Sequence, residues 1–107
     1  MDGNRGFVVR HEKGRNYPAL VCEACGEIIK DVEMAGVVWE RQDDPDGKSD
    51  TVTVLCKTNN CLSSERYKNL PWQEMRHYLL WVLANSGVNT EEKLQKAWEA
   101  AERMNRI

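Results

Sequence analysis

The stretch that decides the fold is Cys22-Glu23-Ala24-Cys25-Gly26, together with a later one, Cys56-Lys57-Thr58-Asn59-Asn60-Cys61. Two residues separate the first pair of thiols and four separate the second, and both spacings are typical of zinc sites. Four thiolates complete the tetrahedral shell that zinc prefers. The chain has 4 cysteines, so the pattern predicts one structural zinc ion per chain, bound by Cys22, Cys25, Cys56 and Cys61.

Other uses of paired cysteines stay open at this point. Two disulfides would fit a secreted chain, whereas thiols in the cytosol stay reduced. A thioredoxin-like redox pair opens a helix within a βαβ unit, and this chain has β-hairpin patterns instead. Iron in a rubredoxin-like site is the main competing metal, because thiolate tetrahedra bind both ions. We interpret His11 and His77 as surface or partly packed residues rather than ligands.

Length and composition indicate one globular domain. The chain has 107 residues, of which 41% are hydrophobic and 30% charged. No run approaches the roughly 18 apolar residues that a membrane span needs, and residues 1–6 lack an apolar signal region. We therefore expect a cytoplasmic protein without a membrane partner, whose four tryptophans fill much of the core.

The net charge of −2 is unevenly distributed. Residues 21–55 carry nine acidic and three basic side chains, whereas residues 1–20 carry four basic and two acidic ones. Binding to nucleic-acid phosphates needs clustered Lys and Arg, so the acidic middle disfavours that role. The alternative nucleic-acid surface is the basic N-terminal hairpin, through Arg10, Lys13 and Arg15.

Two β-hairpins are expected before Cys61. Residues 6–11 and 17–21 are rich in β-forming residues and flank a polar break. Pro18 cannot donate a ladder hydrogen bond, which predicts a sheet edge or a strand that starts after it. Residues 36–40 and 51–55 flank the acidic loop 41–50, interpreted as a solvated connection.

Helices are expected after residue 62. A serine can cap a short helix over residues 63–69. A second helix is expected over residues 71–84, closed by Gly87. A third should begin near Asn89, which has capping-box spacing to Glu92.

One aromatic residue of the second expected helix lies off its apolar stripe. Trp81 falls outside the spacing of Met75, Leu79 and Val82, which indicates either burial against the β-rich part or a second packing surface. We take Trp81 and Tyr78 as the candidate partner-binding residues.

The segment Tyr17-Pro18-Ala19-Leu20-Val21-Cys22-Glu23-Ala24-Cys25-Gly26-Glu27-Ile28-Ile29 resembles the opening knuckle of small bacterial zinc-ribbon proteins, many of which have no assigned function. The resemblance covers residues 7–61 and rests on the cysteines, Gly26 and the hairpins. It implies that the four cysteines bind zinc structurally. It also implies a role in nucleic-acid machinery or as a protein-docking module. The longer second cysteine spacing departs from the common ribbon pattern.

The sequence thus predicts a single α+β domain over residues 1–107. Its β-rich, zinc-ribbon-like part spans residues 6–61 and consists of two β-hairpins, and its helical part spans residues 62–107 with two or three α-helices. The expected function is a non-catalytic zinc-binding module for interaction with an unknown protein or for self-association. An enzyme has least support, because four protein ligands leave no open position on zinc, and no catalytic constellation can be assembled with two histidines.

Overall fold

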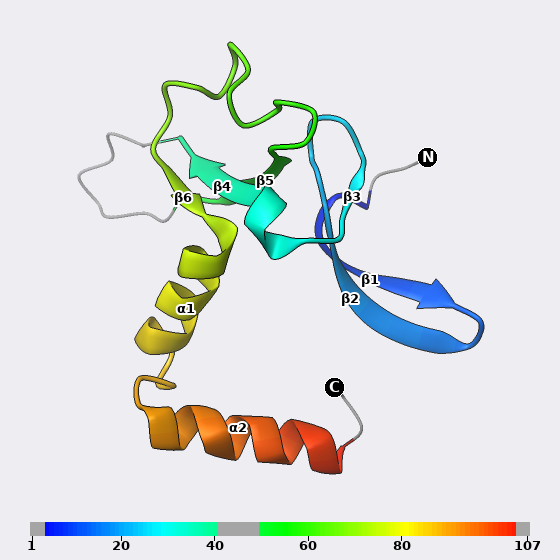
Figure 1. Ribbon diagram of the computed structural model, residues 1–107, viewed down its shortest axis with the longest axis vertical. Helices are drawn as coiled ribbons and strands as arrows, with labels where there is room; N and C mark the ends of the chain where they lie inside the picture. The colour runs from blue at the N-terminus through cyan, green and yellow to red at the C-terminus, as the bar shows by residue number, and fades with distance from the viewer. Residues whose placement is uncertain (1–3, 41–49, 105–107) are drawn as a thin grey trace. The chain divides into compact units, whose positions relative to one another are not determined.

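The computed structural model describes residues 4–40 and 50–104 (Figure 1). The chain divides into two compact units, Met1–Arg76 and His77–Ile107. The α+β class is confirmed, with two small antiparallel sheets followed by two C-terminal helices. The expected boundary between β-rich and helical parts was residue 61, whereas the first unit continues to Arg76. Most of the acidic loop, residues 41–49, lies outside the described residues.

The first sheet has the strand order β1-β2-β3. Strands β1 (Gly6–Glu12) and β2 (Arg15–Val21) form the first expected hairpin. Its two turn residues, Lys13 and Gly14, have φ values of 52° and 74°, as a two-residue hairpin turn requires. The hairpin extends as an arm away from the second sheet (Figure 1).

The short strand β3 (Ile28–Ile29) pairs with β2 only at Leu20 and Val21. At Pro18, therefore, β2 pairs with β1 on one side and has no strand on the other within the described residues. The expectation that this strand is a sheet edge or starts after Pro18 is therefore wrong, because β2 begins at Arg15 and is the central strand. The proline is tolerated because β3 does not reach this position.

The second sheet has the order β5-β4-β6. The second expected hairpin is confirmed as β4 (Ala35–Trp39) and β5 (Val52–Cys56). A short 3₁₀ helix, η1 (Val32–Met34), leads into β4. Because β4 is central, residues 35–38 are all buried.

The third strand of this sheet corrects the expected start of the second helix. Residues 72–74 form β6 (Trp72–Glu74), which pairs with β4 from Gly36↔Glu74 to Val38↔Trp72. Helical periodicity of the apolar residues suggested a helix here. Pairing with β6 satisfies backbone groups on the second edge of buried β4 that would otherwise lie unpaired. This requirement outweighs the helical spacing of the apolar residues.

The expected short helix over residues 63–69 is wrong. These residues form consecutive turns, in which the Lys68 N–H donates to Ser64 O and the Leu70 N–H donates to Tyr67 O. Tyr67 and Leu70 pack against the buried core. A seven-residue segment is too short to sustain a helix by itself, so core contacts decide its path.

The second unit holds most of α1 (Met75–Asn85) and all of α2 (Glu91–Arg103). Gly87 follows α1 with a φ of 93°, and the Val88 N–H donates to Leu83 O at 2.9 Å. This is the expected glycine C-terminus. The cap of α2 is Thr90 rather than Asn89, since the Thr90 side chain accepts from the Lys93 N–H at 3.2 Å.

The core lies in the first unit and is aliphatic and cysteine-rich. One buried cluster consists of Cys22, Val38, Leu55, Cys56 and Cys61, with Ile29, Leu62, Tyr67 and Leu70 packed against it. The expectation that tryptophans fill the core is wrong. Three of them are exposed by about half, and Trp39 is half-buried. Cys22, Cys56 and Cys61 are therefore part of the hydrophobic core itself.

Candidate metal centre

The two sheets each contribute one cysteine pair to a single cluster. Cys22 directly follows β2, and Cys25 lies in the turn after it. Cys56 is the last residue of β5, and Cys61 ends the turn that follows. The four Sγ atoms all lie within 4.8 Å of one another. The ligand set expected from spacing alone thus converges at the junction of the sheets.

The distances between sulfur atoms suit a tetrahedral metal site. The Sγ atoms of Cys25 and Cys56 lie 3.7 Å apart. A tetrahedral ion with metal–sulfur bonds of about 2.3 Å separates its sulfur ligands by about 3.8 Å, whereas a disulfide needs about 2.05 Å. All four cysteines are free thiols. The cluster therefore has the dimensions of a thiolate cage rather than of disulfides.

The first turn is closed by backbone hydrogen bonds around Gly26. The Gly26 N–H donates to Cys22 O, and the Cys22 N–H donates to Glu27 O, both at 2.9 Å. Gly26 has a φ of 79°, a conformation that favours glycine. On the outside of the turn, the Arg5 guanidinium donates to Glu23 O at 3.1 Å. Arg5 thus stabilises the turn that carries the first two thiols.

The second turn also contains a residue with positive φ, but this residue is not a glycine. Asn60 adopts a φ of 58°, which asparagine tolerates better than most residues. The Leu62 N–H donates to Cys56 O at 3.1 Å, and the Ser64 hydroxyl donates to Cys61 O at 2.7 Å. These bonds fix both ends of the longer Cys56–Cys61 spacing, so the extra two residues are accommodated by a wider turn.

Glu23 joins the two sheets and was missed by the sequence reasoning. Its N–H donates to Val54 O at 2.8 Å, and its Oε2 accepts from the Val54 N–H at 2.7 Å. Both backbone groups of one β5 residue are therefore satisfied by a residue between the first two cysteines. Gly6 leaves room for this carboxylate, because a Cβ there would lie 3.1 Å from Glu23 Oε2. Nothing in the cysteine spacing distinguishes Glu23 from an ordinary exposed acidic residue.

Two hydrogen-bond donors face the sulfur atoms. The Cys56 N–H donates to Cys22 Sγ, and the Asn59 side-chain amide donates to Cys25 Sγ, both at 3.4 Å. Donors of this kind stabilise negative charge on metal-bound sulfur and fix the direction of the ligand.

Burial divides the cysteines into three buried residues and one exposed residue. Cys22, Cys56 and Cys61 are buried, whereas Cys25 is exposed. The Asn59 amide lowers the pKa of the Cys25 thiol to about 7. Burial raises the pKa of the Cys56 thiol and that of the Cys61 thiol. A cation would be needed to keep these two sulfurs as thiolates near neutral pH.

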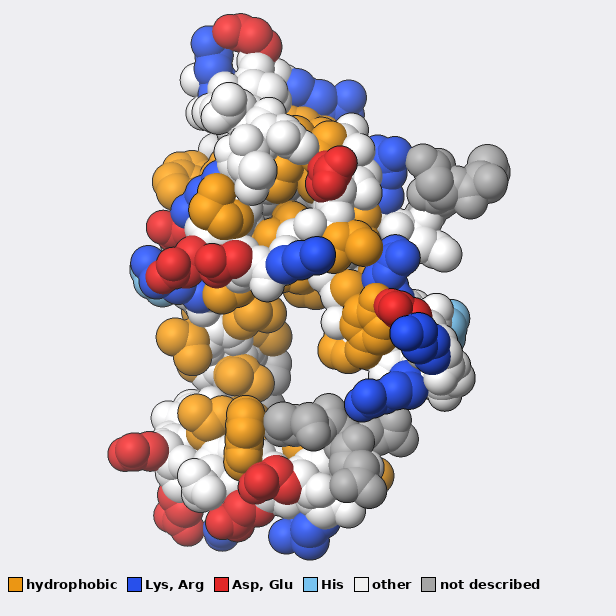
Figure 2. Space-filling view, turned by 45° about the vertical axis from the view of Figure 1, so that its right-hand side comes forward, with side chains coloured by type: hydrophobic (Ala, Val, Ile, Leu, Met, Phe, Trp, Pro, Cys, Tyr) orange, Lys and Arg blue, Asp and Glu red, His pale blue; other side chains and the backbone are white. Residues whose placement is uncertain are grey.

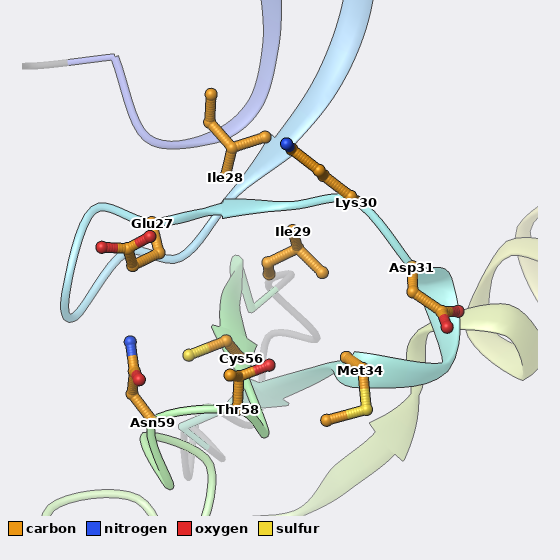
Figure 3. A pocket seen from close by; sticks show the side chains of 9 residues that line it. All are labelled: Glu27, Ile28, Ile29, Lys30, Asp31, Met34, Cys56, Thr58 and Asn59. Atoms are coloured by element: carbon orange, nitrogen blue, oxygen red, sulfur yellow. The ribbon is translucent and has the colours of Figure 1, made fainter.

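A pocket of about 400 Å³ lies beside the cluster (Figure 3). Ile29 points toward Cys56 and Thr58, and Ile28 lies on the opposite side of β3 from Ile29. Cys56 is the one member of the cysteine cluster in its lining. This pocket therefore adjoins the candidate site through one ligand only.

The candidate partner-binding residues lie in α1. Trp81 is 51% exposed and Tyr78 is half-buried. Their rings meet edge to face, with centroids 6.5 Å apart.

The candidate nucleic-acid residues all lie on the β1–β2 arm. Arg10 faces Tyr17 and Arg15 faces Glu12 across the arm, and Lys13 is in its turn. The Tyr17 hydroxyl donates to Glu12 Oε2 at 3.1 Å. An acidic side chain therefore lies among the basic ones.

Comparison with protein-family models, with curated proteins and with solved structures found no match to this chain. Within the residues that the structure describes, none of the helices has both the length and the apolar character to cross a membrane.

Proposed function

We propose that this chain is a non-catalytic zinc-binding module in which one structural zinc ion holds the two sheets together. The observation that carries this proposal is the meeting of four sulfur atoms, two from each sheet, within 4.8 Å, with three of the four cysteines buried in the core. Zinc accepts four thiolates in a tetrahedron and has no redox chemistry of its own. Cys22, Cys25, Cys56 and Cys61 would hold it.

The donor set supports a structural role over a catalytic one. Catalytic zinc keeps a position for water or substrate, whereas four cysteines complete the shell. The unequal spacings also favour zinc over iron, because the two turns of a rubredoxin-like site match. Thiolate clusters bind either ion, so metal analysis decides between them.

The helical unit supports a second element of the proposal, a protein-docking surface. Seven consecutive residues of α1, 78–84, are apolar, so apolar side chains occur on every side of the helix. Leu80 is 60% and Trp81 51% exposed. Figure 2 shows hydrophobic side chains along this helix. Large exposed aromatic and aliphatic side chains are typical of interaction sites.

Nucleic-acid binding remains the alternative function. Arg10 and Arg15 lie on the same side of the arm. Arg15 is directly opposite Glu12, and Arg10 is two residues from Glu12 on the same strand, so all three side chains point to one face. Glu12 shares that face, and its charge opposes binding to phosphate. A surface with so few cations supplies only weak affinity at physiological salt.

The test compares two variants of the metal-loaded full chain. Trp81→Ala should abolish binding of a protein partner, or self-association, that proceeds through α1, while metal content and the first unit are unchanged, and this binding should depend weakly on salt. Neutralising Arg10, Lys13 and Arg15 together serves as the control and should leave that binding intact. Micromolar binding to random DNA or RNA at physiological salt, lost in the triple variant and kept in Trp81→Ala, would contradict the docking proposal.

A further inference from the structure

We propose that the free edge of β1 pairs antiparallel with β1 of a second copy of this chain, forming one continuous sheet across a two-fold dimer. This surface lies in the first unit and does not involve Trp81, so it goes beyond the docking surface of the helical unit.

Within residues 4–40 and 50–104, no strand pairs with the outer edge of β1. β1 is the terminal strand of its sheet, and the arm it belongs to extends away from the second sheet (Figure 1). Native proteins usually protect such an edge with a proline, a bulge, charged side chains or a covering segment. The charged residues of β1, Arg10 and Glu12, alternate with Phe7 and Val9 and lie on the other face of the sheet. β1 has no proline, and its register with β2 is unbroken from Gly6↔Val21 to Glu12↔Arg15.

The hydrogen-bonding pattern identifies which backbone groups face outward. The Cys22 N–H donates to Glu27 O on the β3 side of the sheet. Backbone groups alternate in direction along an antiparallel strand, so the backbone groups of Pro18 and Leu20 also point away from β1. Pro18 has no N–H to offer β1, which agrees with this assignment.

The same alternation applies to the opposite strand. Phe7, Val9 and His11 lie opposite Leu20, Pro18 and Asn16, so they form the pairs that exchange no hydrogen bonds with β2. Their N–H and C=O groups point to the free edge of β1. A second strand can therefore pair there without disturbing the hairpin.

The side chains at these positions are apolar and uncovered. Phe7 is 52% exposed and Val9 60%. Both share one face of the sheet with Pro18, because residues directly opposite in a ladder point to the same side. In Figure 2, hydrophobic side chains lie on the arm beside the Lys and Arg side chains. Pairing of two arms would join two such apolar strips on one face.

Charge selects the register and favours a second copy as the occupant. A two-fold axis at Val9 places Val9 opposite its own copy, Phe7 opposite His11, and Val8 opposite Arg10, so no like charges meet directly. A two-fold axis at Arg10 would instead place two arginines opposite each other, which is destabilising. The two-fold contact also closes on itself. The other edge of the same sheet, β3, is only 2 residues long.

The interface is small, so the dimer should be weak. Contacts confined to one strand edge and one apolar strip fall below the size of stable dimers, and the dissociation constant should lie between about 1 µM and 1 mM. Sedimentation equilibrium of the metal-loaded full chain across that range should therefore follow a monomer–dimer equilibrium.

The decisive variant is Val9→Pro, with Val9→Thr as its matched control. Proline removes an outward N–H and leaves the β1–β2 bonds in place, and by symmetry the dimer loses two central hydrogen bonds. Val9→Pro should weaken dimerisation by about tenfold or more, and Val9→Thr, which keeps the donor, by less. Trp81→Ala should dimerise like the unmodified chain. A dimer that survives Val9→Pro, or that Trp81→Ala abolishes, overturns the proposal and assigns association to another surface.

Amide hydrogen exchange tests the same edge without any substitution. In the unmodified protein, protection of the Phe7, Val9 and His11 amides should rise with protein concentration, while Val8 and Arg10, whose N–H groups face β2, should change little. Concentration-independent protection of Val9 in a monomeric sample would show that another segment covers the edge. A monomer up to about 1 mM with unprotected Val9 would also contradict the proposal.

Discussion

The two units of this chain differ in how much of their apolar surface is buried. In the first unit, Val38 and Leu55 are buried in one cluster with Cys22, Cys56 and Cys61, which come from the ends of strands in both sheets. In the second unit, no described residue is buried. Small domains bury little apolar surface, and many are stabilised by a metal, a disulfide or a partner. We propose that a metal ion serves this purpose in the first unit and docking to a partner in the second.

The largest expected effect of a single substitution is in the first unit, at the cysteines. Cys22→Ser and Cys61→Ser should both abolish metal binding and unfold the two sheets, because structural zinc contributes about 10–16 kcal/mol to folding in small domains. Ser63→Ala, beside Cys61 but with an exposed side chain, is the control. Circular dichroism and metal content would report both effects. A folded, metal-loaded Cys61→Ser protein would contradict the four-ligand site.

A matched pair of leucines measures the difference between the units. Leu55 is fully buried, whereas Leu94 is 43% exposed. Leu55→Ala should lower the free energy of unfolding by about 2–5 kcal/mol, and Leu94→Ala by less than about 1 kcal/mol. Urea denaturation of metal-loaded protein measures both. Equal losses would mean that the helical unit is as well packed as the sheets.

A smaller effect is expected at the start of α2. Thr90→Ala removes the side chain that caps the Lys93 N–H and should destabilise the helix by about 1 kcal/mol. Hydrogen exchange of the first-turn amides would detect this change. Metal affinity should be unchanged, since the substitution lies in the other unit. A change in metal affinity would show that the two units are coupled.

The smallest effect is expected for the acidic loop. Replacing residues 41–50 by a short glycine-containing turn should change stability little, because closure entropy depends weakly on loop length. A loss of more than about 2 kcal/mol in urea denaturation would show that the loop packs or binds something.

The sequence predicted the parts of this fold that depend on local pattern and failed where distant pairing decides. Cysteine spacing and β-forming segments suffice to predict both hairpins and the converging ligand set. Strand β6 was missed because Trp72 and the apolar residues after it have helical spacing. Residues 72–74 form a strand only because they pair with the edge of β4 that β5 does not occupy. Glu23 was missed for the same reason, since its partner Val54 lies far away in the sequence.

The predicted N-cap of α2 was wrong by one residue. Asn89 and Thr90 are both good capping residues, and the pairing of Asn89 with Glu92 favoured the first. The Thr90 side chain accepts the first-turn hydrogen bond instead. Choosing one or the other of two adjacent capping residues moves the start of the helix by one position. The backbone geometry decides between them, and the residue types do not.

The most direct test of the central claim is the metal content of the purified full chain, measured together with its thiols and its fold. Elemental analysis should find close to one zinc per chain, and a strong chelator should remove it and unfold the sheets, with loss of the dispersed amide resonances of Val38 and Leu55. A folded protein that contains no metal and four titratable free thiols would contradict the account, and one iron per chain would replace zinc with the competing ion.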